Sequence, residues 1–367
     1  MIARRQVNGA FVGFTRCGTG DSPVGYRYMT GRETRSWKAA GELAASFKRP
    51  LLLSHTRPDC DAFGSLIALR VLLGEAGADP IALAFDPIPR TYEFLKARFP
   101  TISVWQHDFF EADLGGVDGI IIADTCTYNQ LTPLESWLRT STLPKIVIDH
   151  HATRDALADH YLTDESAAAA CLLIYEWARL MNWSLDDDAA AALFLGIATD
   201  TGWFAHSNTN GRALAAAAEL ASSGINPNDY HVMIHQTDTI ARVRLLTVAL
   251  NSLELFAEDR LAVMTLELDT FKRLEVRPSE TENMINEPLR IRSVVVSILV
   301  IEEPDGLIRV SFRSKAPIAS YCELDIDVAR LAGDFGGGGH RRASGARVEG
   351  SLQEVRRKVV EHVAQRL

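Results

Sequence analysis

Three short apolar runs, each followed closely by an acidic or histidine residue, limit what this chain can fold into. The runs are Pro50–Leu53, Gly119–Ala123 and Lys145–Ile148, and the polar residues after them include His55, Asp124 and Asp149. Continuous apolar runs are typical of strands buried on both faces, and helical apolar spacing over residues 64–73 indicates a crossover helix. This pattern predicts an α/β fold with a mainly parallel sheet flanked by helices. Because the carboxyl ends of parallel strands meet at one edge, the polar residues should gather there.

Carboxylates and imidazoles dominate the clusters that follow these runs. The clusters comprise His55, Asp59 and Asp61, then Asp124, then Asp149, His150 and His151, and finally Asp200. They supply the oxygen and nitrogen ligands that Mn²⁺, Mg²⁺, Fe²⁺ and Zn²⁺ accept, and the one intervening thiol, Cys60, makes no structural zinc pattern. Burying so much charge without a cation would be costly. We therefore predict a hydrolytic centre that holds two divalent ions and acts on a phosphate-bearing substrate.

Each of these residues also has a simpler interpretation. A single aspartate after a strand, such as Asp61 or Asp124, is more often a helix N-cap than a metal ligand. An isolated pair such as His150 and His151 is more often exposed or part of a satisfied core. The recurrence of acidic and histidine residues after three strands of one chain favours the metal site over these interpretations.

A glycine-rich segment far downstream, Gly336–Gly339, precedes His340 and Arg341. Glycine runs are usually flexible turns, but without a Cβ their backbone N–H groups can approach an anion closely. Arginine binds phosphate in a bidentate manner, and Arg313 and Ser314 add a further guanidinium and a hydroxyl. We predict that this region grips the substrate phosphate across an interdomain cleft while the acidic clusters carry out the cleavage.

The pattern of elements changes along the chain and predicts two domains. The expected parts are an N-terminal extension at residues 1–34, a catalytic domain at 35–235, a helical linker at 236–258 and a substrate-binding domain at 259–367. Alanine-rich helices are expected at 166–181 and 186–198. Strand-like runs at 261–268, 293–301 and 307–312 predict that the C-terminal part is a smaller α/β domain.

The composition excludes several classes of protein. The 367 residues carry a net charge of −9, which argues against a broad basic surface for nucleic acid. It does not argue against a short oligonucleotide held by metal ions and a few arginines. No stretch is long and apolar enough for a membrane span, and the N-terminal segment lacks a signal-peptide pattern. Five scattered cysteines form no disulfide pattern, so we expect a cytoplasmic protein.

Taken in order, these motifs resemble the signature of the DHH phosphoesterase superfamily. The resemblance rests on His55-x-x-x-Asp59-x-Asp61 with Gly64-Ser65, on Asp124, on Asp149-His150-His151 and on Thr199-Asp200-Thr201-Gly202. Further downstream, Phe312-Arg313-Ser314 and residues 335–345 resemble the DHH-associated substrate-binding domain. The order and spacing are similar to the branch that contains bacterial bifunctional oligoribonucleases, which also act as pAp phosphatases.

The resemblance implies a role for each matching residue. Two metal ions would be held by six residues, His55 and Asp59 at one ion, Asp61, His150 and Asp200 at the other, and Asp124 as the bridge. The catalytic candidates are Asp124, His151, which would face the substrate phosphate, and Asp149, which would orient His150. The substrate-binding candidates are His151, Arg313, Ser314, Gly337, Gly338, Gly339, His340 and Arg341. A carboxylate-rich set without thiolates favours Mn²⁺, with Mg²⁺ or Co²⁺ as alternatives.

The expected activity is hydrolysis of short 5′-phosphorylated RNA or DNA, di- to pentanucleotides, to mononucleotides, and conversion of pAp to AMP. The alternatives are a stand-alone phosphodiesterase for cyclic-di-AMP or linear dinucleotides and a RecJ-like single-strand exonuclease. A family II inorganic pyrophosphatase would lack Gly337–His340, and a non-catalytic nucleotide-binding protein is disfavoured because all six ligands are present. No membrane partner is expected, and the sequence leaves open a homodimer, the polarity of cleavage and the role of residues 1–34.

Overall fold

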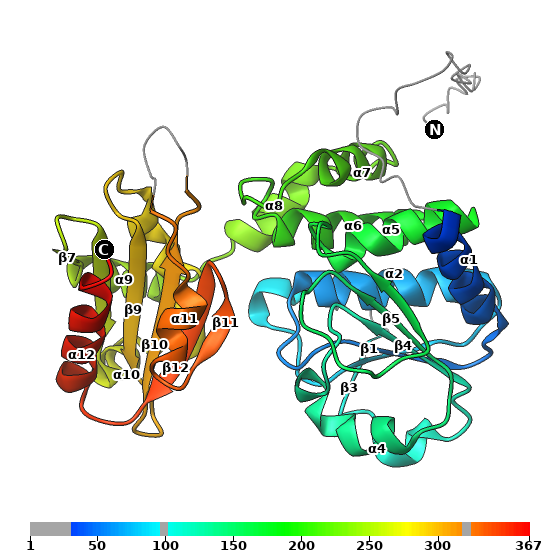
Figure 1. Cartoon of the computed structure of the whole chain (residues 1–367), viewed down its shortest axis with the longest axis horizontal. Coiled ribbons are helices and arrows are strands. Elements are labelled where there is room, and N and C mark those ends of the chain that lie inside the picture. Colours follow the sequence, from blue (N-terminus) through cyan, green and yellow to red (C-terminus); the bar gives the residue numbers. More distant parts are fainter. Residues whose placement is uncertain (1–30, 96–101, 318–323) are drawn as a thin grey trace, which may run out of the picture. The chain divides into compact units, whose positions relative to one another are not determined.

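The computed structural model describes residues 31–95, 102–317 and 324–367 (Figure 1). The chain divides into two compact units, and the division falls between Ile234 and His235. Most of the N-terminal extension expected at residues 1–34 lies outside the described residues, which begin with α1 (Gly31–Ser46). None of the described helices is both long enough and apolar enough to cross a membrane.

The parallel sheet predicted from the apolar runs is confirmed in the first unit. Its six strands in the described residues lie in the order β3-β2-β1-β4-β5-β6, and every neighbouring pair is parallel. The strands are β1 (Pro50–Leu53), β2 (Ile81–Ala84), β3 (Ile102–Val104), β4 (Gly119–Ala123), β5 (Lys145–Asp149) and β6 (His160–Thr163). The sequence indicated β1, β4 and β5 but not β2, β3 or β6.

Helices cover both faces of this sheet. The helices of the first unit, besides α1, are α2 (Cys60–Glu75), α4 (Glu135–Thr140), α5 (Ala170–Met181), α6 (Asp187–Asp200), α7 (Gly211–Ala221) and α8 (Pro227–His235), of which α7 packs on α5 and α6. Alternate strand residues point to opposite faces, so Leu52 and Ile121 pack with α2, α5 and α6, whereas Leu51 and Ile122 pack on the α4 side. In Figure 1, α2, α5 and α6 lie above the sheet and α4 lies below it.

Two helix boundaries differ from the expected ones. The helix expected at 166–181 begins only at Ala170, because residues 164–167 close a turn in which the Ala167 N–H donates to the Asp164 carbonyl. The helix expected at 186–198 extends to Asp200, so the last turn of α6 carries this aspartate.

The second unit contains a mixed sheet. Its six strands in the described part of the chain lie in the order β11-β12-β10-β9-β8-β7, with β8 and β9 parallel and the other neighbours antiparallel. The strands are β7 (Glu254–Phe256), β8 (Leu261–Leu266), β9 (Val296–Glu302), β10 (Ile308–Ser314), β11 (Gly338–His340) and β12 (Ala343–Val348). A turn at residues 304–306 joins β9 to β10, and in it the Gly306 N–H donates to the Glu303 carbonyl.

Helices pack on both faces of this sheet as well. They are α9 (Ile240–Asn251), α10 (Leu268–Leu274), α11 (Val328–Gly333) and α12 (Leu352–Ala364). One core joins Ile298 and Phe312 to α11 and α12, and the other joins Leu299 to α9 and α10. Helix α9 lies in the segment expected to be a helical linker, and its fully buried Leu245 is part of the second core.

Candidate metal centre and substrate-binding residues

The polar residues that follow β1, β4 and β5 gather at one edge of the first sheet. The order of the strands reverses between the neighbours β1 and β4, and the crevice at such a reversal is where open α/β sheets bind ligands. His55 lies two residues beyond β1, Asp124 one residue beyond β4, and His150 directly after β5. The topology of the sheet therefore accounts for the meeting of residues that are far apart in sequence.

The structure brings together all six residues that were predicted to bind metal. The first ligand group is His55, Asp59 and Asp124, and the second ligand group is Asp61, His150 and Asp200. Within each group, the candidate ligand atoms lie within 4.8 Å of one another. Asp124 forms a further group with His150 and His151, so it connects the first and second ligand groups.

Short-range contacts position the first ligand group. Asp59 is the N-cap of α2, and its Oδ1 accepts hydrogen bonds from the N–H groups of Asp61 and Ala62 at 3.0 and 3.1 Å. Only one of its oxygens is used in this way, so an N-cap and a metal ligand are compatible in the same side chain. Nδ1 of His55 donates to the Thr56 carbonyl at 2.9 Å, which leaves Nε2 directed at Asp124.

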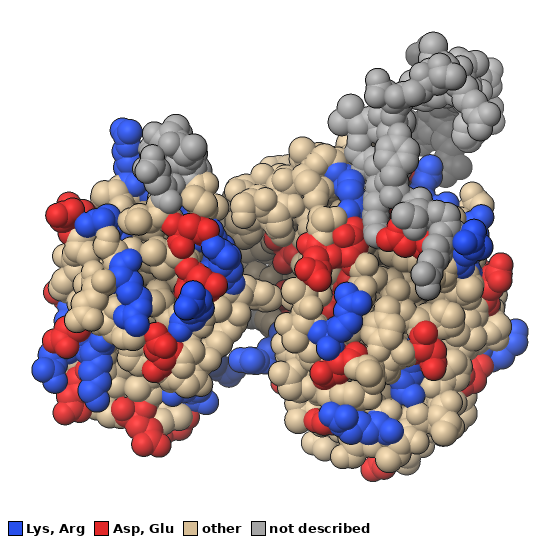
Figure 2. Space-filling view, viewed as in Figure 1, with Lys and Arg blue, Asp and Glu red and all other residues tan. Residues whose placement is uncertain are grey.

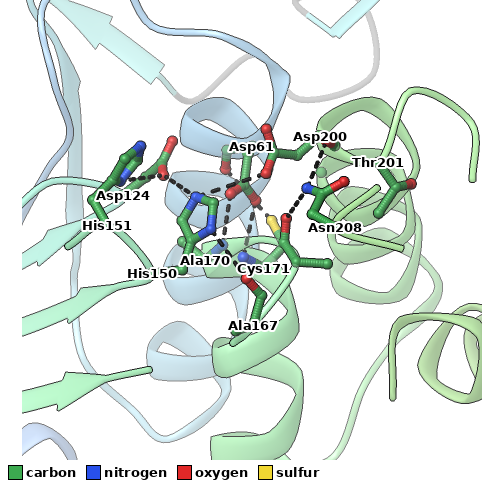
Figure 3. A network of polar contacts seen from close by, with 12 residues as sticks. Asp61, Asp124, His150, His151, Ala167, Ala170, Cys171, Asp200, Thr201 and Asn208 are labelled. Atoms are coloured by element: carbon green, nitrogen blue, oxygen red, sulfur yellow. Dashed lines mark hydrogen bonds and ion pairs between the residues drawn. The ribbon is translucent and has the colours of Figure 1, made fainter. Parts of the chain in front are cut away.

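Contacts from more distant elements position the second ligand group. Asp61 is buried in the first turn of α2, and its two oxygens accept from the first two N–H groups of α5 at 2.6 and 2.9 Å. Nδ1 of His150 donates to the Ala167 carbonyl at 3.3 Å. Its Nε2 lies 3.7 Å from Oδ2 of Asp200, on the last turn of α6. These contacts leave the candidate ligand atoms facing one another (Figure 3).

Asp124 lies between the two groups. Its Oδ2 is 3.3 Å from Nε2 of His55, and its Oδ1 is 3.4 Å from Nε2 of His150. The side chain is buried, and Oδ1 has no well-formed hydrogen bond from any described residue. Its backbone has φ +61°, in the left-handed region that residues other than glycine rarely adopt and that recurs at functional sites. A buried carboxylate oxygen without a well-placed donor, facing other ligands, fits a bound cation.

Both histidines beside Asp124 hold their protons strongly. Burial alone would lower the pKa of His55, but the hydrogen bond to Asp124 and its charge outweigh burial and raise the pKa to about 9. The same opposition raises the pKa of His150 to about 10. Burial alone would raise the pKa of Asp124, yet its contacts with the two histidines hold its pKa below the usual range. A divalent ion would take the place of the two Nε2 protons.

The remaining carboxylates resist ionisation when no cation is present. Burial, followed by the negative charge of Asp124, raises the pKa of Asp61 to about 7. Burial, followed by the negative charge of Asp61, raises the pKa of Asp200 to about 8. Mutual repulsion of buried carboxylates is relieved by a bound divalent ion, so the residues present fit such an ion electrostatically as well as geometrically.

Asp149 has a different partner from the one that we expected. It was predicted to orient His150, but its Oδ1 accepts from Nδ1 of His151 at 2.7 Å and from the backbone N–H of His151 at 3.2 Å. In extended chain, residues two apart point to the same side, whereas His150 points away from Asp149 toward Ala167. Asp149 is fully buried, and its hydrogen bond with Nδ1 fixes the tautomer and the orientation of His151.

The residues that support the second ligand group through hydrogen bonds were not predicted from the sequence. Nδ2 of Asn208 donates to the carbonyls of Ala168 and Asp200, each at 3.1 Å (Figure 3). The Ala167 carbonyl, which accepts from His150, belongs to the same segment. A backbone carbonyl has no sequence signal, and the only local signal for Asn208 is a polar stretch before a helix.

In the second unit, the sheet register places two predicted substrate-binding residues in one row. Arg313 on β10 and His340 on β11 both pair with Ala343 of β12, which lies between them. Their backbones are therefore two strand spacings apart, roughly 10 Å. Burial lowers the pKa of Arg313, opposed by the charge of Glu282.

The glycine-rich segment is partly a strand and not only a loop. Gly338 and Gly339 belong to the edge strand β11, which pairs with β12. A Cβ on Gly337 would lie 2.1 Å from the carbonyl oxygen of Gly345, and Gly339 has φ +138°. Glycine is therefore required for close packing of this edge. An edge strand keeps backbone groups outside the ladder, which suits the predicted contact with an anion.

The remaining predicted residues of this unit, Arg341 and Ser314, contact polar groups within the same unit. Arg341 forms an ion pair with Asp325, and Arg342 pairs with the same carboxylate. The Ser314 hydroxyl donates to the Ile326 carbonyl at 2.8 Å. Arg341 is mostly exposed, with 57% of its side chain accessible, so it can still reach a ligand, whereas the hydroxyl of Ser314 is used inside the unit.

Two family models match the chain. Residues 51–197 match the N-terminal domain of the DHH family, and residues 259–367 match the DHHA1 domain. The first match runs from β1 into α6 and includes five of the six candidate metal ligands; the sixth, Asp200, lies just beyond it. The second match covers β8 to the end of the chain, with every predicted substrate-binding residue of the second unit.

Several characterised bacterial proteins are similar over most of the chain. The bifunctional oligoribonuclease and PAP phosphatase NrnA of Bacillus subtilis is 27% identical over 301 residues, which cover 81% of this chain and 88% of that protein. The protein of the same name from Thermus thermophilus is 24% identical over 347 residues, which cover 91% and 96%.

Solved structures show the same fold. An exopolyphosphatase-related protein from Bacteroides fragilis has a TM-score of 0.80 at 21% identity and covers 90% of this chain and 97% of that chain. RecJ from Thermus thermophilus in complex with Mn²⁺ has a TM-score of 0.51 at 18% identity and covers 92% of this chain and 55% of RecJ. With its DHH domain, its DHHA1 domain and its cluster of histidine and aspartate ligands, this chain belongs to the DHH phosphoesterase family.

Proposed function

We propose that this protein uses two divalent metal ions to hydrolyse short 5′-phosphorylated oligonucleotides to mononucleotides and pAp to AMP. The observation that carries the proposal is the position of Asp124, with one carboxylate oxygen beside His55 and the other beside His150. Two ligand groups joined by one carboxylate are the arrangement used for displacement at phosphorus. The oligoribonuclease and PAP phosphatase activities named for the relatives support the choice of substrate.

The first ligand group would hold one ion and the second ligand group the other, with Asp124 shared between them. When bound, such ions lower the pKa of a water molecule and neutralise the phosphoryl oxygens. The two groups contain carboxylate and imidazole donors and no thiolate, a set that favours Mn²⁺, with Mg²⁺ or Co²⁺ as alternatives. The Mn²⁺ complex of RecJ supports the same choice.

His151 is proposed to act directly on the substrate. Because Asp149 accepts from its Nδ1, its Nε2 can face the phosphate. Burial alone would lower the pKa of His151, but the hydrogen bond to Asp149 raises it above its ordinary value, which favours the protonated imidazole. Hydrolysis joins the water oxygen to phosphorus and breaks the bond to the ester oxygen. His151 can give that leaving oxygen the proton that it needs.

Substrate recognition is assigned to the second unit. Arg313, His340 and Arg341, with the backbone of Gly337 to Gly339, are proposed to bind a phosphate that is not the one cleaved. A long strand would need a continuous basic groove, whereas basic and acidic side chains are interspersed on the face of each unit seen in Figure 2, and the net charge is −9. This charge distribution supports a short substrate.

A substrate panel with Mn²⁺ tests the proposal. It contains 5′-phosphorylated RNA and DNA from dinucleotides to twenty-mers, pAp, cyclic-di-AMP and pyrophosphate, and kcat/KM is measured for each. We expect di- to tetranucleotides to be hydrolysed much faster than twenty-mers, and pAp to lose a phosphate in the same site.

Three results of the panel would contradict the proposal. A rate that rises with length and persists in high salt would identify a RecJ-like exonuclease. Preference for cyclic-di-AMP would identify a cyclic-dinucleotide phosphodiesterase, and preference for pyrophosphate would identify an inorganic pyrophosphatase.

A further inference from the structure

Residues 164–171, which comprise the segment between β6 and α5 and the first two residues of α5, contact the second ligand group at two points. At the end of these residues, the first two N–H groups of α5 donate to Asp61 at 2.6 and 2.9 Å. Within the segment, the Ala167 carbonyl accepts from Nδ1 of His150 at 3.3 Å and fixes the proton on that nitrogen. Two of the three candidate ligands therefore take their orientation from these residues.

Asn208 extends this support to the third ligand. Its Nδ2 donates to the Ala168 carbonyl in the segment and to the backbone carbonyl of Asp200, each at 3.1 Å. A single amide thus joins the segment to the last turn of α6, which carries Asp200. A displacement of the segment would move all three ligands of the second group.

The first ligand group is supported differently in the described residues. His55 is oriented by the carbonyl of its own neighbour, Thr56, at 2.9 Å. Asp59 is held by two N–H groups at the start of α2. The backbone N–H of Asp124 donates to the Ile148 carbonyl in the sheet at 2.9 Å. These contacts do not pass through residues 164–169.

Arg212 on α7 anchors the segment. Its Nε and Nη2 donate to the two oxygens of Glu176 on α5 at 2.9 and 2.7 Å. Its Nη1 donates to Asp164 at 2.7 Å and to the Ser166 hydroxyl at 3.1 Å, both in the segment. Only 13% of the Arg212 side chain is accessible, so this network is shielded from solvent and ordered by a bidentate contact.

We propose that Asn208 and Arg212 are positioning residues that set the affinity of the second ligand group for its divalent ion. The inference rests on the metal centre of the proposed function and adds two residues that do not touch the ion. Loss of a partner that orients a metal ligand typically lowers metal affinity by about 10–100-fold. Because the first ligand group does not depend on the segment, the two bound ions should respond unequally.

The test measures Mn²⁺ binding to the full chain after removal of metal with a chelator. Isothermal titration calorimetry gives the stepwise affinities, and electron paramagnetic resonance of unbound Mn²⁺ counts the bound ions. The variants are Asn208→Ala, Arg212→Gln and Arg212→Lys. Lysine keeps the charge but loses the bidentate contact, so it should restore part of the affinity.

Arg179→Ala is the matched control. Arg179 also joins α5 to α7, through Glu219 at 2.8 Å, but its side chain is 54% accessible and does not contact residues 164–169. Circular dichroism confirms that each variant is folded, and if Arg212→Gln is not, Asn208→Ala alone decides the test, because its side chain is exposed.

The outcomes separate this inference from the proposed function. One affinity lowered about 10–100-fold in Asn208→Ala and Arg212→Gln, with the other affinity and the control unchanged, supports the inference. Both affinities unchanged in folded variants, or both lowered equally, overturns it. Failure of the wild-type chain to bind two Mn²⁺ ions would overturn the proposed function itself.

Discussion

The two six-stranded sheets of this protein use their polar residues in opposite ways. The carboxyl end of the parallel sheet in the first unit carries buried candidate ligands: Asp61 accepts two hydrogen bonds from the start of α5, and Asp124 lies between His55 and His150. In the mixed sheet of the second unit, Gly338, Gly339 and His340 lie on the exposed edge strand β11, and Arg341, which follows it, is paired with a carboxylate of the same unit.

The difference between the two sheets corresponds to the different requirements of metal binding and phosphate binding. Ligands for a metal centre must be fixed before the ion arrives, because a small displacement of one ligand removes much of its effect. A residue that grips an outer phosphate contributes binding energy and can exchange one partner for another. We therefore expect changes in the first unit to abolish turnover and changes in the second unit mainly to weaken binding.

The largest effect is expected at the residue shared by the two ligand groups. Asp124→Asn should lower kcat by roughly 10³-fold or more, as for removal of one member of a catalytic unit. Asparagine tolerates the left-handed backbone at φ +61°, so the change removes charge without adding strain. Single-turnover cleavage of a 5′-phosphorylated dinucleotide measures the effect. Asp187→Ala, an exposed carboxylate in the first turn of α6, is the control. Cleavage above a few per cent of wild type would refute the bridging role.

The next effect tests whether Asp149 acts through His151. His151→Ala should lower kcat by about 10²–10⁴-fold, the range for loss of a general acid. Asp149→Asn should cause a smaller loss, because the imidazole remains but loses the acceptor for its Nδ1–H. Measured kcat values for the double variant should equal those of His151→Ala alone. Additive losses would show that Asp149 acts on something other than His151.

A smaller effect is expected in the second unit. Arg313→Ala and His340→Ala should each raise KM for 5′-phosphorylated oligonucleotides by roughly tenfold, the cost of one charge-assisted hydrogen bond, with a lesser change in kcat. Steady-state kinetics with a trinucleotide measures both constants. Arg347→Ala, an exposed arginine on β12 that pairs with Glu303 and Asp305, should leave them unchanged. Unchanged KM in both variants would remove this unit from substrate recognition.

The smallest effect concerns how the Tm of the metal-free protein depends on pH. The pKa values of His55 and Asp61 are raised to about 9 and about 7, so both groups bind protons more strongly in the folded chain. Their stabilisation is present at low pH and is lost as the pH rises through these values. With chelator, the Tm of the first unit should fall by about 5 °C between pH 6 and 9, and Mn²⁺ should reverse this trend. Differential scanning calorimetry measures both curves. A Tm that rises with pH under chelator contradicts the prediction.

The sequence predicted the centre of the first sheet but not its margins. Strands such as β4 are buried on both faces, so their residues form an unbroken apolar run that is visible in the sequence. The edge strands β3 and β6 have three and four residues, and His160 begins β6, so their pattern does not stand out. The existence of these strands is decided by pairing with neighbours, which the local sequence does not encode.

The same distinction applies to the candidate site. The six ligands could be predicted because they lie in motifs that follow strands or end a helix, and the structure brings them together. The residues that orient them could not, because Asn208 reaches a carbonyl 40 residues away and Arg212 reaches a carboxylate 48 residues away. Such partners are brought together only by folding. In the sequence alone, nothing distinguishes Asn208 and Arg212 from the other asparagines and arginines.

The pairing of Asp325 with both Arg341 and Arg342 has a consequence for how the second unit responds to salt. Two bare guanidinium groups that bind a phosphate would depend steeply on ionic strength, because a phosphate site releases ions when it is neutralised. Under the proposed function, an incoming phosphate would exchange with the Asp325 carboxylate, so fewer ions would be released. Recognition of the outer phosphate should therefore differ little between dilute buffer and the salt concentration of a cell.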